Sequence, residues 1–123
     1  MGKYVIKQTS DGCYMFNLVA SNGQVIGTSQ KYRALNSAKS GVESVKRISY
    51  TRVEDQTVQD VKKLTHPKWE LYEDDVGEFR FRLKAMNGEI ILASQGYSAK
   101  ASAQKGLESV KKNAEEAEVV VEE

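Results

Sequence analysis

Cysteine, histidine, proline and tryptophan are scarce in this chain, and each occurs once among 123 residues. With Cys13 alone, no disulfide can form within the chain. Structural zinc needs four Cys or His ligands and catalytic zinc usually takes three that are rich in His, so His66 cannot supply either site. We therefore expect neither a metal centre nor another cofactor.

Long apolar runs are missing as well. The longest are only a few residues, such as Ile90–Ala93, whereas a membrane-spanning helix needs roughly 20. The N-terminal Met-Gly-Lys-Tyr leads directly into alternating residues and lacks the apolar region of a signal peptide. We expect a cytoplasmic protein that does not attach to a membrane.

Recognisable catalytic patterns are absent too. A nucleophile activated by histidine would depend on His66, which stands beside Pro67 in a stretch that we interpret as a linker. Cys13 has no neighbouring cation or helix start in the sequence to activate it. The carboxylates of 73–75 lack the ligand spacing of a calcium loop, and no glycine-rich phosphate loop occurs. We expect a protein that is not an enzyme.

The main positive feature is an internal repeat. Residues 4–47 align with 69–112 at a constant offset without a gap, and 18 of the paired positions are identical. Chance would give about three at ordinary amino-acid frequencies. A repeat unit cannot bury its apolar face alone, so two copies predict one domain with a shared core. We divide the chain into repeat one (1–54), a linker (55–68) and repeat two (69–123).

Each repeat is expected to contain three strands, a helix and a final strand. Alternating apolar residues indicate half-buried strands, and Asn22-Gly23 and Asn87-Gly88 are typical of tight hairpin turns. Apolar residues spaced three and four apart predict the helices. The predicted strands are 4–9, 14–20, 24–29, 50–53, 69–73, 79–85, 89–94 and 118–121, and the helices lie near 35–48 and 99–114.

Local signals refine the helices and the linker. Ser98 is a plausible N-cap, whereas its counterpart Arg33 cannot cap, so the first helix could begin nearer 36 or 37. Gly41 and Gly106 lie on the apolar helix faces, which suggests close approach to the sheet and a clash for any large side chain. In the linker, the apolar residues at 58, 61 and 64 could face one side of a short helix that ends before Pro67.

In the second repeat, the residues at 77–85, 87–91, Ser94, 96–98 and 106–112 form a recognisable set. With them, the second repeat resembles the YegP-like family of small bacterial and archaeal proteins. The first repeat is more divergent, with Lys31, Arg33, Met15 and Asn17 in place of the residues found in the second. The resemblance implies an α+β fold in which two β-β-β-α-β units form one continuous antiparallel sheet. Both helices would cover one face, and the C-terminal strands would be exchanged about a pseudo-twofold axis. Single-repeat members reach this arrangement by dimerising, and the family brings no established activity.

Charge and the open sheet face suggest one binding hypothesis. Residues 1–54 carry a net charge of +5 and residues 69–123 a net charge of −5, so the two halves either complement each other or present a basic surface to an anionic partner. Arg80, Arg82, Lys84 and Lys7 should lie on the uncovered face, where they could contact a nucleic-acid backbone. Alternatively, their aliphatic stems only shield the sheet.

A duplicated Ser-Gln-x-Tyr motif suggests a second site. Ser29 and Tyr32 in the first copy, and Ser94 and Tyr97 in the second, lead from a strand into a helix. Helix N-termini favour anions, although such residues often only pack the corner.

The leading hypothesis is a non-enzymatic binding module with a protein partner, and the alternative is weak nucleic-acid binding. The ligand and the pathway remain unknown. We expect a monomer that contains an internal pseudo-dimer.

Overall fold

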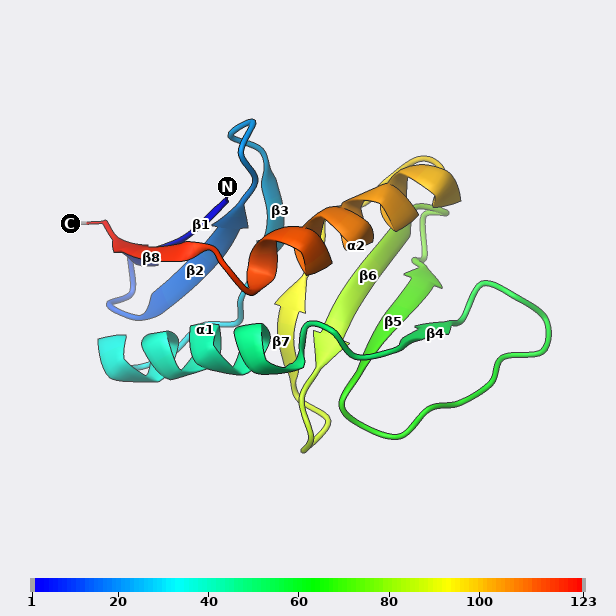
Figure 1. Ribbon diagram of the computed structural model, residues 1–123, viewed down its shortest axis with the longest axis horizontal. Helices are drawn as coiled ribbons and strands as arrows, with labels where there is room; N and C mark the ends of the chain where they lie inside the picture. Colours follow the sequence, from blue (N-terminus) through cyan, green and yellow to red (C-terminus); the bar gives the residue numbers. More distant parts are fainter. Residues whose placement is uncertain (1, 123) are drawn as a thin grey trace.

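Eight strands form one mixed sheet in the computed structural model, which describes residues 2–122 (Figure 1). The sheet order is β4-β5-β6-β7-β3-β2-β1-β8, so the two halves meet at β3 and β7. The elements are β1 (Lys3–Gln8), β2 (Tyr14–Val19), β3 (Val25–Thr28), α1 (Leu35–Ile48), β4 (Val53–Asp55), β5 (Lys68–Glu73), β6 (Phe79–Lys84), β7 (Ile90–Ala93), α2 (Lys100–Ala114) and β8 (Glu118–Val121).

The hairpins follow the turn signals in the sequence. Gly23 and Gly88 have φ values of 88° and 84°, a region that a tight hairpin turn requires and that glycine adopts without strain. The ladder irregularity next to each turn falls at equivalent positions, Leu18/Val19 and Leu83/Lys84. The predicted strands are therefore present, with bounds shifted by at most three residues.

The strand that follows each helix pairs with the first strand of the other half. β4 pairs with β5 and β8 pairs with β1, and both pairs are parallel. The prediction of a wholly antiparallel sheet was wrong for these outer pairs. Tight hairpins force neighbouring strands to be antiparallel, whereas a strand that returns after a helix is free to pair in either direction.

One aromatic residue on each first strand reinforces this exchange. The Tyr4 hydroxyl donates to the carbonyl of Ala114 at 2.7 Å, and the Trp69 indole N–H donates to the carbonyl of Ser49 at 2.9 Å. The two acceptors occupy equivalent positions at the C-terminal ends of α2 and α1. Each bond therefore satisfies a carbonyl that its helix leaves free.

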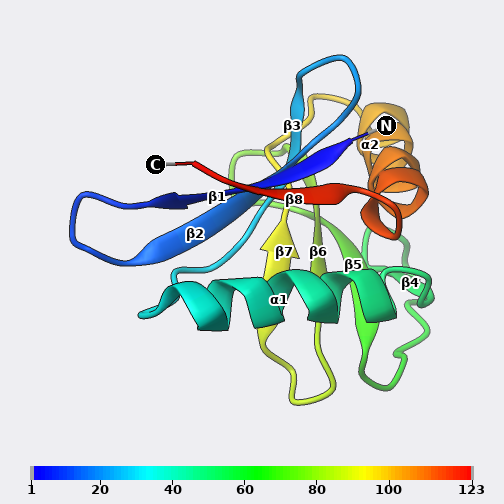
Figure 2. The same ribbon diagram turned by 60° about the vertical axis from the view of Figure 1, so that its left-hand side comes forward.

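Both helices bury their apolar faces against the same side of the sheet. Alternate residues of the long strands meet the helices in a single buried cluster, which explains the period of two. α1 contacts β1, β2 and β7, while α2 contacts β3 and β6, so each helix spans the junction of the halves (Figure 2). The largest fully buried side chains are Trp69, Tyr4, Phe16, Phe81, Ile6, Leu18, Leu71, Leu83 and Leu92.

The predicted range of 35–48 for the first helix is confirmed, whereas the predicted cap of the second helix is not. Ala34 and Ala99 are the N-caps, and neither forms a side-chain cap hydrogen bond. Ser98 is therefore not the cap, and α1 begins at Leu35 without the alternative start at 36 or 37. An extended alanine precedes the first turn of the helix in both repeats. Because neither alanine can cap the helix with its side chain, we attribute the start of each helix to its packing on the sheet.

The linker contains no helix within the described residues. The backbone N–H of Leu64 donates to the Glu54 carboxylate at 2.7 Å, and that of Thr57 donates to Asp55 at 2.9 Å. The helix prediction was wrong because these carboxylates draw the backbone into an irregular path, and local side-chain bonds of this kind compete with helix formation.

Candidate functional site

The basic residues predicted to face outward lie on the side of the sheet opposite the helices. On β6, Phe81 and Leu83 are buried, and Arg80, Arg82 and Lys84 alternate with them. The register places Arg80 opposite Tyr72, Arg82 opposite Glu70, and Lys84 opposite Lys68.

A buried carboxylate, Glu70, binds most of these cations. Its side chain is 4% exposed, with Arg82 Nε at 2.6 Å, Lys84 Nζ at 3.2 Å and Lys68 Nζ at 3.3 Å. The Arg82 guanidinium also stacks over Tyr72, 4.1 Å from the ring centroid. Burial alone would raise the pKa of Glu70, but these donors lower it.

A second buried carboxylate, Glu54, joins the network from β4. It accepts Lys68 Nζ at 2.7 Å, Gln56 Nε2 at 2.6 Å and the Leu64 backbone N–H. Burial would raise the pKa of Glu54, yet the three donors together hold it at about 2. The charged residues Glu54, Lys68 and Glu70 are therefore satisfied internally, and the linker is tied to the sheet edge.

Arg80 is also paired within the chain. Its Nε lies 2.7 Å from Asp74 Oδ2, and Asp74 further accepts the backbone N–H groups of Val76 and Glu78 in the hairpin turn. The Arg80 guanidinium lowers the pKa of Asp74 below its usual range. Each of the three basic residues predicted on β6 thus contacts a carboxylate of this chain. This network was not predicted from the sequence, although Lys68 and Glu70 alternate on β5 in the same outward register.

The other half of the open face is different in character. Val5 and Lys7 on β1, and Met15 and Val19 on β2, lie opposite the helices and are only half buried. Val120 on β8 adjoins Val5 and is 37% exposed. Within residues 2–122, Lys7 has no ion-pair partner. We call Val5, Met15, Val19 and Val120 the apolar open patch.

The two Ser-Gln-x-Tyr motifs lie at equivalent turns between a strand and a helix, and their serines form equivalent hydrogen bonds. Ser29 Oγ accepts the Phe16 backbone N–H and Ser94 Oγ accepts that of Phe81, both at 2.9 Å. The serines thus extend the ladders past the ends of β3 and β7, in agreement with the corner-packing alternative.

The tyrosines of these motifs fill the space over the helix glycines. Tyr32 stacks on Phe16 and Tyr97 on Phe81. A Cβ at Gly41 would overlap the Tyr32 hydroxyl, and one at Gly106 would overlap that of Tyr97. The glycines were predicted correctly to exclude larger side chains, but the contact is with the corner tyrosine as well as the sheet. Among the described residues, the Tyr32 hydroxyl is the buried polar side-chain atom without a hydrogen bond.

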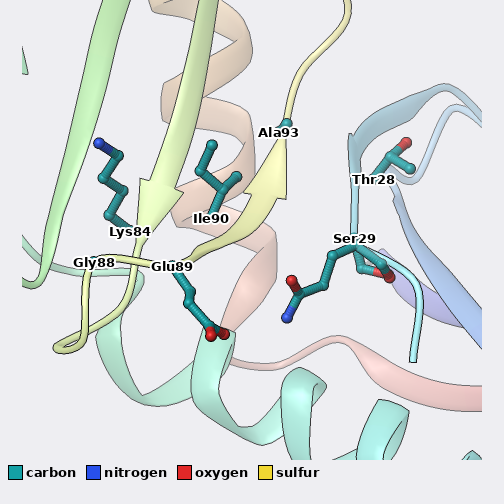
Figure 3. Close-up of a pocket in the computed structure, with 8 residues that line it drawn as sticks. Thr28, Ser29, Lys84, Gly88, Glu89, Ile90 and Ala93 are labelled. Atoms are coloured by element: carbon teal, nitrogen blue, oxygen red, sulfur yellow. The ribbon is translucent and has the colours of Figure 1, made fainter. Parts of the chain in front are cut away.

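A hollow of about 560 Å³ opens where β3 and β7 meet. Within the described strands β3 and β7, the register consists of the pair Thr28–Ala93. The two strands diverge beside this pair (Figure 3). Figure 3 shows Lys84, Glu89 and Ile90 on one side of the hollow and Thr28 and Ser29 on the other. Ser29 thus lines a cavity in addition to its structural role.

Residues 2–122 contain neither a metal-binding cluster nor a membrane-spanning helix. No group of three or more His, Cys, Asp and Glu side chains among residues 2–122 is arranged to hold a metal ion. Across the same residues, neither helix is long and apolar enough to cross a membrane.

Known proteins share this sequence and fold. The family model described as "Domain of unknown function (DUF1508)" matches residues 10–55 and 74–120. A UPF0339 protein of Pseudomonas aeruginosa is 37% identical over 94% of this chain and 92% of its own length. A UPF0339 protein of Agrobacterium fabrum is 55% identical over 53 residues, which are 43% of this chain and 86% of that protein. The solution structure of YegP from E. coli, a protein of unknown function, has a TM-score of 0.79 at 32% identity. That match covers 98% of this chain and 91% of the other.

These matches establish the family. The chain belongs to the DUF1508 family, whose members here include UPF0339 and YegP proteins. The resemblance predicted from the second repeat is therefore confirmed, as is an α+β fold with two helices and a single sheet. The descriptions of these relatives name no activity, so the function of the family is unknown.

Proposed function

We propose that this protein is a non-enzymatic binding module that contacts a protein partner through the apolar open patch. The observation that carries the proposal is the difference between the two halves of the open face. In the second half, the charged side chains pair with one another, and the linker donates a hydrogen bond to Glu54. In the first half, Val5, Met15, Val19 and Val120 keep part of their apolar surface accessible.

The chemistry of the patch suits a protein partner better than a phosphate backbone. Partly exposed aliphatic side chains and a methionine gain from losing water, and methionine adapts to irregular partner surfaces. Lys7 lies opposite Met15 and Lys3 lies opposite Val19, so one cation borders the patch at each end. Asn17 lies between Met15 and Val19 and opposite Val5, so the patch is a group of aliphatic side chains around one amide.

A capture experiment tests this proposal. The wild-type chain, the double variant Val5→Glu/Met15→Glu and the control Lys105→Ala on the outer side of α2 are immobilised and exposed to native extract after nuclease treatment. We expect the same protein to co-elute with wild type and control and to be lost with the double variant. Equal recovery by the double variant, with its fold verified by circular dichroism, would contradict the proposal.

Nucleic-acid binding through Lys7, Arg80, Arg82 and Lys84 stays a prediction with a separate test. Ion pairs to Glu70 and Asp74 would have to compete with phosphate. Binding by phosphate contacts must weaken steeply as salt rises, whereas an apolar interface need not. The test measures retention of the chain on immobilised nucleic acid as the salt concentration rises from low to physiological. A steep loss of retention would indicate phosphate contacts, and the absence of retention would contradict nucleic-acid binding.

We further infer that the two repeats are related by a pseudo-twofold axis and form, within one chain, the equivalent of a dimer. The two separate matches of the family model support this, as does the Agrobacterium relative, which is about one repeat long. The reciprocal pairs β4–β5 and β8–β1 support it as well. On this basis we propose repeats at 1–54 and 69–123 around the 55–68 linker, and a monomeric chain. We also propose a cytoplasmic location, as expected from the composition and the N-terminal residues.

A further inference from the structure

The two ends of the sheet are unequal. At one end, β4 is three residues long, and its Glu54 is buried and bonded to the linker at Leu64. At the other end, Val119, Val120 and Val121 of β8 are 40%, 37% and 39% exposed. Natural edge strands are usually protected by proline, lysine, bulges or a covering segment. Within the described part of the chain, β8 carries none of these at its three valines.

The free edge of β8 presents backbone groups ready for pairing. The N–H of Glu122 donates to the carbonyl of Ile6 at 2.7 Å on the inner side. In a parallel ladder, alternate residues direct their N–H and C=O groups to the same neighbour. Glu118, Val120 and Glu122 therefore face β1, and Val119 and Val121 direct their backbone groups outward.

The side chains at this edge define where an added strand would rest. Val119 and Val121 lie opposite Tyr4 and Ile6, on the helix side of the sheet. Past Val121 lies a hollow of about 540 Å³, lined also by Lys7, Gln8, Tyr14, Leu35 and Glu122. A strand along β8 would place alternate apolar side chains beside the two valines and at the mouth of this hollow.

Charge specifies the ends of that strand. Glu118 and Glu122 flank the valines, and Glu115 and Glu116 precede them. On the inner side, β1 already shows the complementary pattern, with Lys3 opposite Glu118 and Lys7 beyond the pair Ile6–Val121. A second basic-flanked strand would match the acidic flanks in the same way on the outer side.

We propose that the outer edge of β8 binds an extended segment of a partner protein, added as a further strand, with a basic residue at each end of a short apolar stretch. This is β-augmentation, in which main-chain bonds supply affinity and alternate side chains supply specificity. A second copy of the chain fits less well, because antiparallel pairing of two β8 strands would bring Glu118 of one copy near Glu122 of the other. The site shares Val120 with the apolar open patch, but pairing at this edge depends on the outward backbone groups of Val119 and Val121. Val5→Glu/Met15→Glu changes only the patch and Val121→Pro changes only the edge, so either proposal can fail without the other.

A peptide titration tests the proposal. The probe is acetyl-Lys-Val-Thr-Val-Lys-amide, and the matched control replaces both lysines by glutamate. Binding to the full chain is followed through amide chemical shifts. We expect the basic peptide to shift Val119 and Val121 and the acidic peptide to bind at least tenfold more weakly. Equal binding of both peptides, or shifts confined to another part of the sheet, would overturn the proposal.

Variants of the edge sharpen the test. Val121→Pro removes an outward N–H without touching the β1 ladder, a position that tolerates proline on an edge strand, and should reduce peptide affinity tenfold or more. Val120→Pro is the matched change on the inward side and should instead lower the melting temperature. Glu118→Lys/Glu122→Lys should reverse the preference toward the acidic peptide, which keeps the test valid if Val121→Pro is unstable. A wild-type dimer that Val121→Pro abolishes would refute the partner segment in favour of self-pairing.

Discussion

Single aromatic side chains set the stability of this small core. Phe81 is fully buried, packs edge-on to Trp69 and stacks on Tyr97. We expect Phe81→Ala to reduce the free energy of unfolding by about 3–5 kcal/mol, because the truncation leaves a cavity between sheet and helix. Urea denaturation measures the loss, with Phe16→Ala as the equivalent change in the other half. A loss below about 1 kcal/mol would show that the core side of β6 is wrongly assigned.

The outward residues of β6 are more than a solvated surface. The alternation of 79–85 places Arg80, Arg82 and Lys84 away from the helix-covered core, and this pattern alone predicts that the triple change Arg80→Ala/Arg82→Ala/Lys84→Ala leaves the fold intact. The structure revises this expectation, because Glu70 would keep only Lys68 as a charged partner. A buried carboxylate that loses its partners is destabilising.

The revised prediction is a measurable loss of stability in the triple variant, with partial recovery when Glu70→Gln is added. Recovery is expected because the neutral amide no longer requires a cation. Thermal unfolding of both variants checks this. If the quadruple variant is no more stable than the triple, then Glu70 is not the reason for the loss.

Acid should weaken the fold through Glu54. Its pKa falls from 4.5 to about 2 in the folded chain, so the carboxylate contributes stability above the unfolded value, and this is lost as the pH falls from about 5 to 2. We expect a decrease of about 3 kcal/mol across this range from Glu54 alone. Glu54→Gln should flatten that part of the profile and lower stability at neutral pH, whereas Glu116→Gln, an exposed change, should do neither.

At the scale of elements, each first strand is joined to the helix end of the other half. We expect Tyr4→Phe to cost about 1–3 kcal/mol, because the buried carbonyl of Ala114 loses its donor at 2.7 Å. Chemical denaturation measures the change, and Tyr14→Phe serves as the control for hydroxyl removal on a neighbouring strand. An equal effect in both variants would indicate that the bond across the halves has no special weight.

Much of this arrangement was predictable, because it depends on patterns within each repeat. Alternation in 14–20 and 79–85 gave the strands and their buried side, and helical spacing gave α1 and α2. The parallel pairing of β4 with β5 and of β8 with β1 was not predictable, because a strand that returns after a helix can pair in either direction. The irregular path of the linker depends on the hydrogen bond from Leu64 to Glu54. These residues are too far apart in the sequence for a local pattern to reveal the bond. For the same reason, the partners of Arg80, Arg82 and Lys84 became known only from the register.

At the scale of the whole molecule, strand exchange makes the halves interdependent. A fragment of residues 1–54 would lack the strand that pairs with β1, and a fragment of 55–123 would lack β4. We expect neither fragment to fold as a monomer, and we expect an equimolar mixture to recover the circular dichroism of the intact chain. A folded monomer of 1–54 in sedimentation would argue against exchange as a requirement for folding.

The intact chain should itself be monomeric, since each repeat finds its counterpart in the same molecule. Sedimentation equilibrium at micromolar concentration should give the 13.7 kDa of one chain. A tight dimer at that concentration would contradict the internal pseudo-dimer.

The pairing of β8 with β1 also orders events during synthesis. The second half finds its exchanged strand already made, because β4 precedes β5 in the chain. The first half must wait, since β8 is translated after every other strand and both helices. On the ribosome, β1 therefore keeps an unpaired edge until all these elements have been made, and closure of this side of the sheet is a late event governed by a contact between residues distant in sequence.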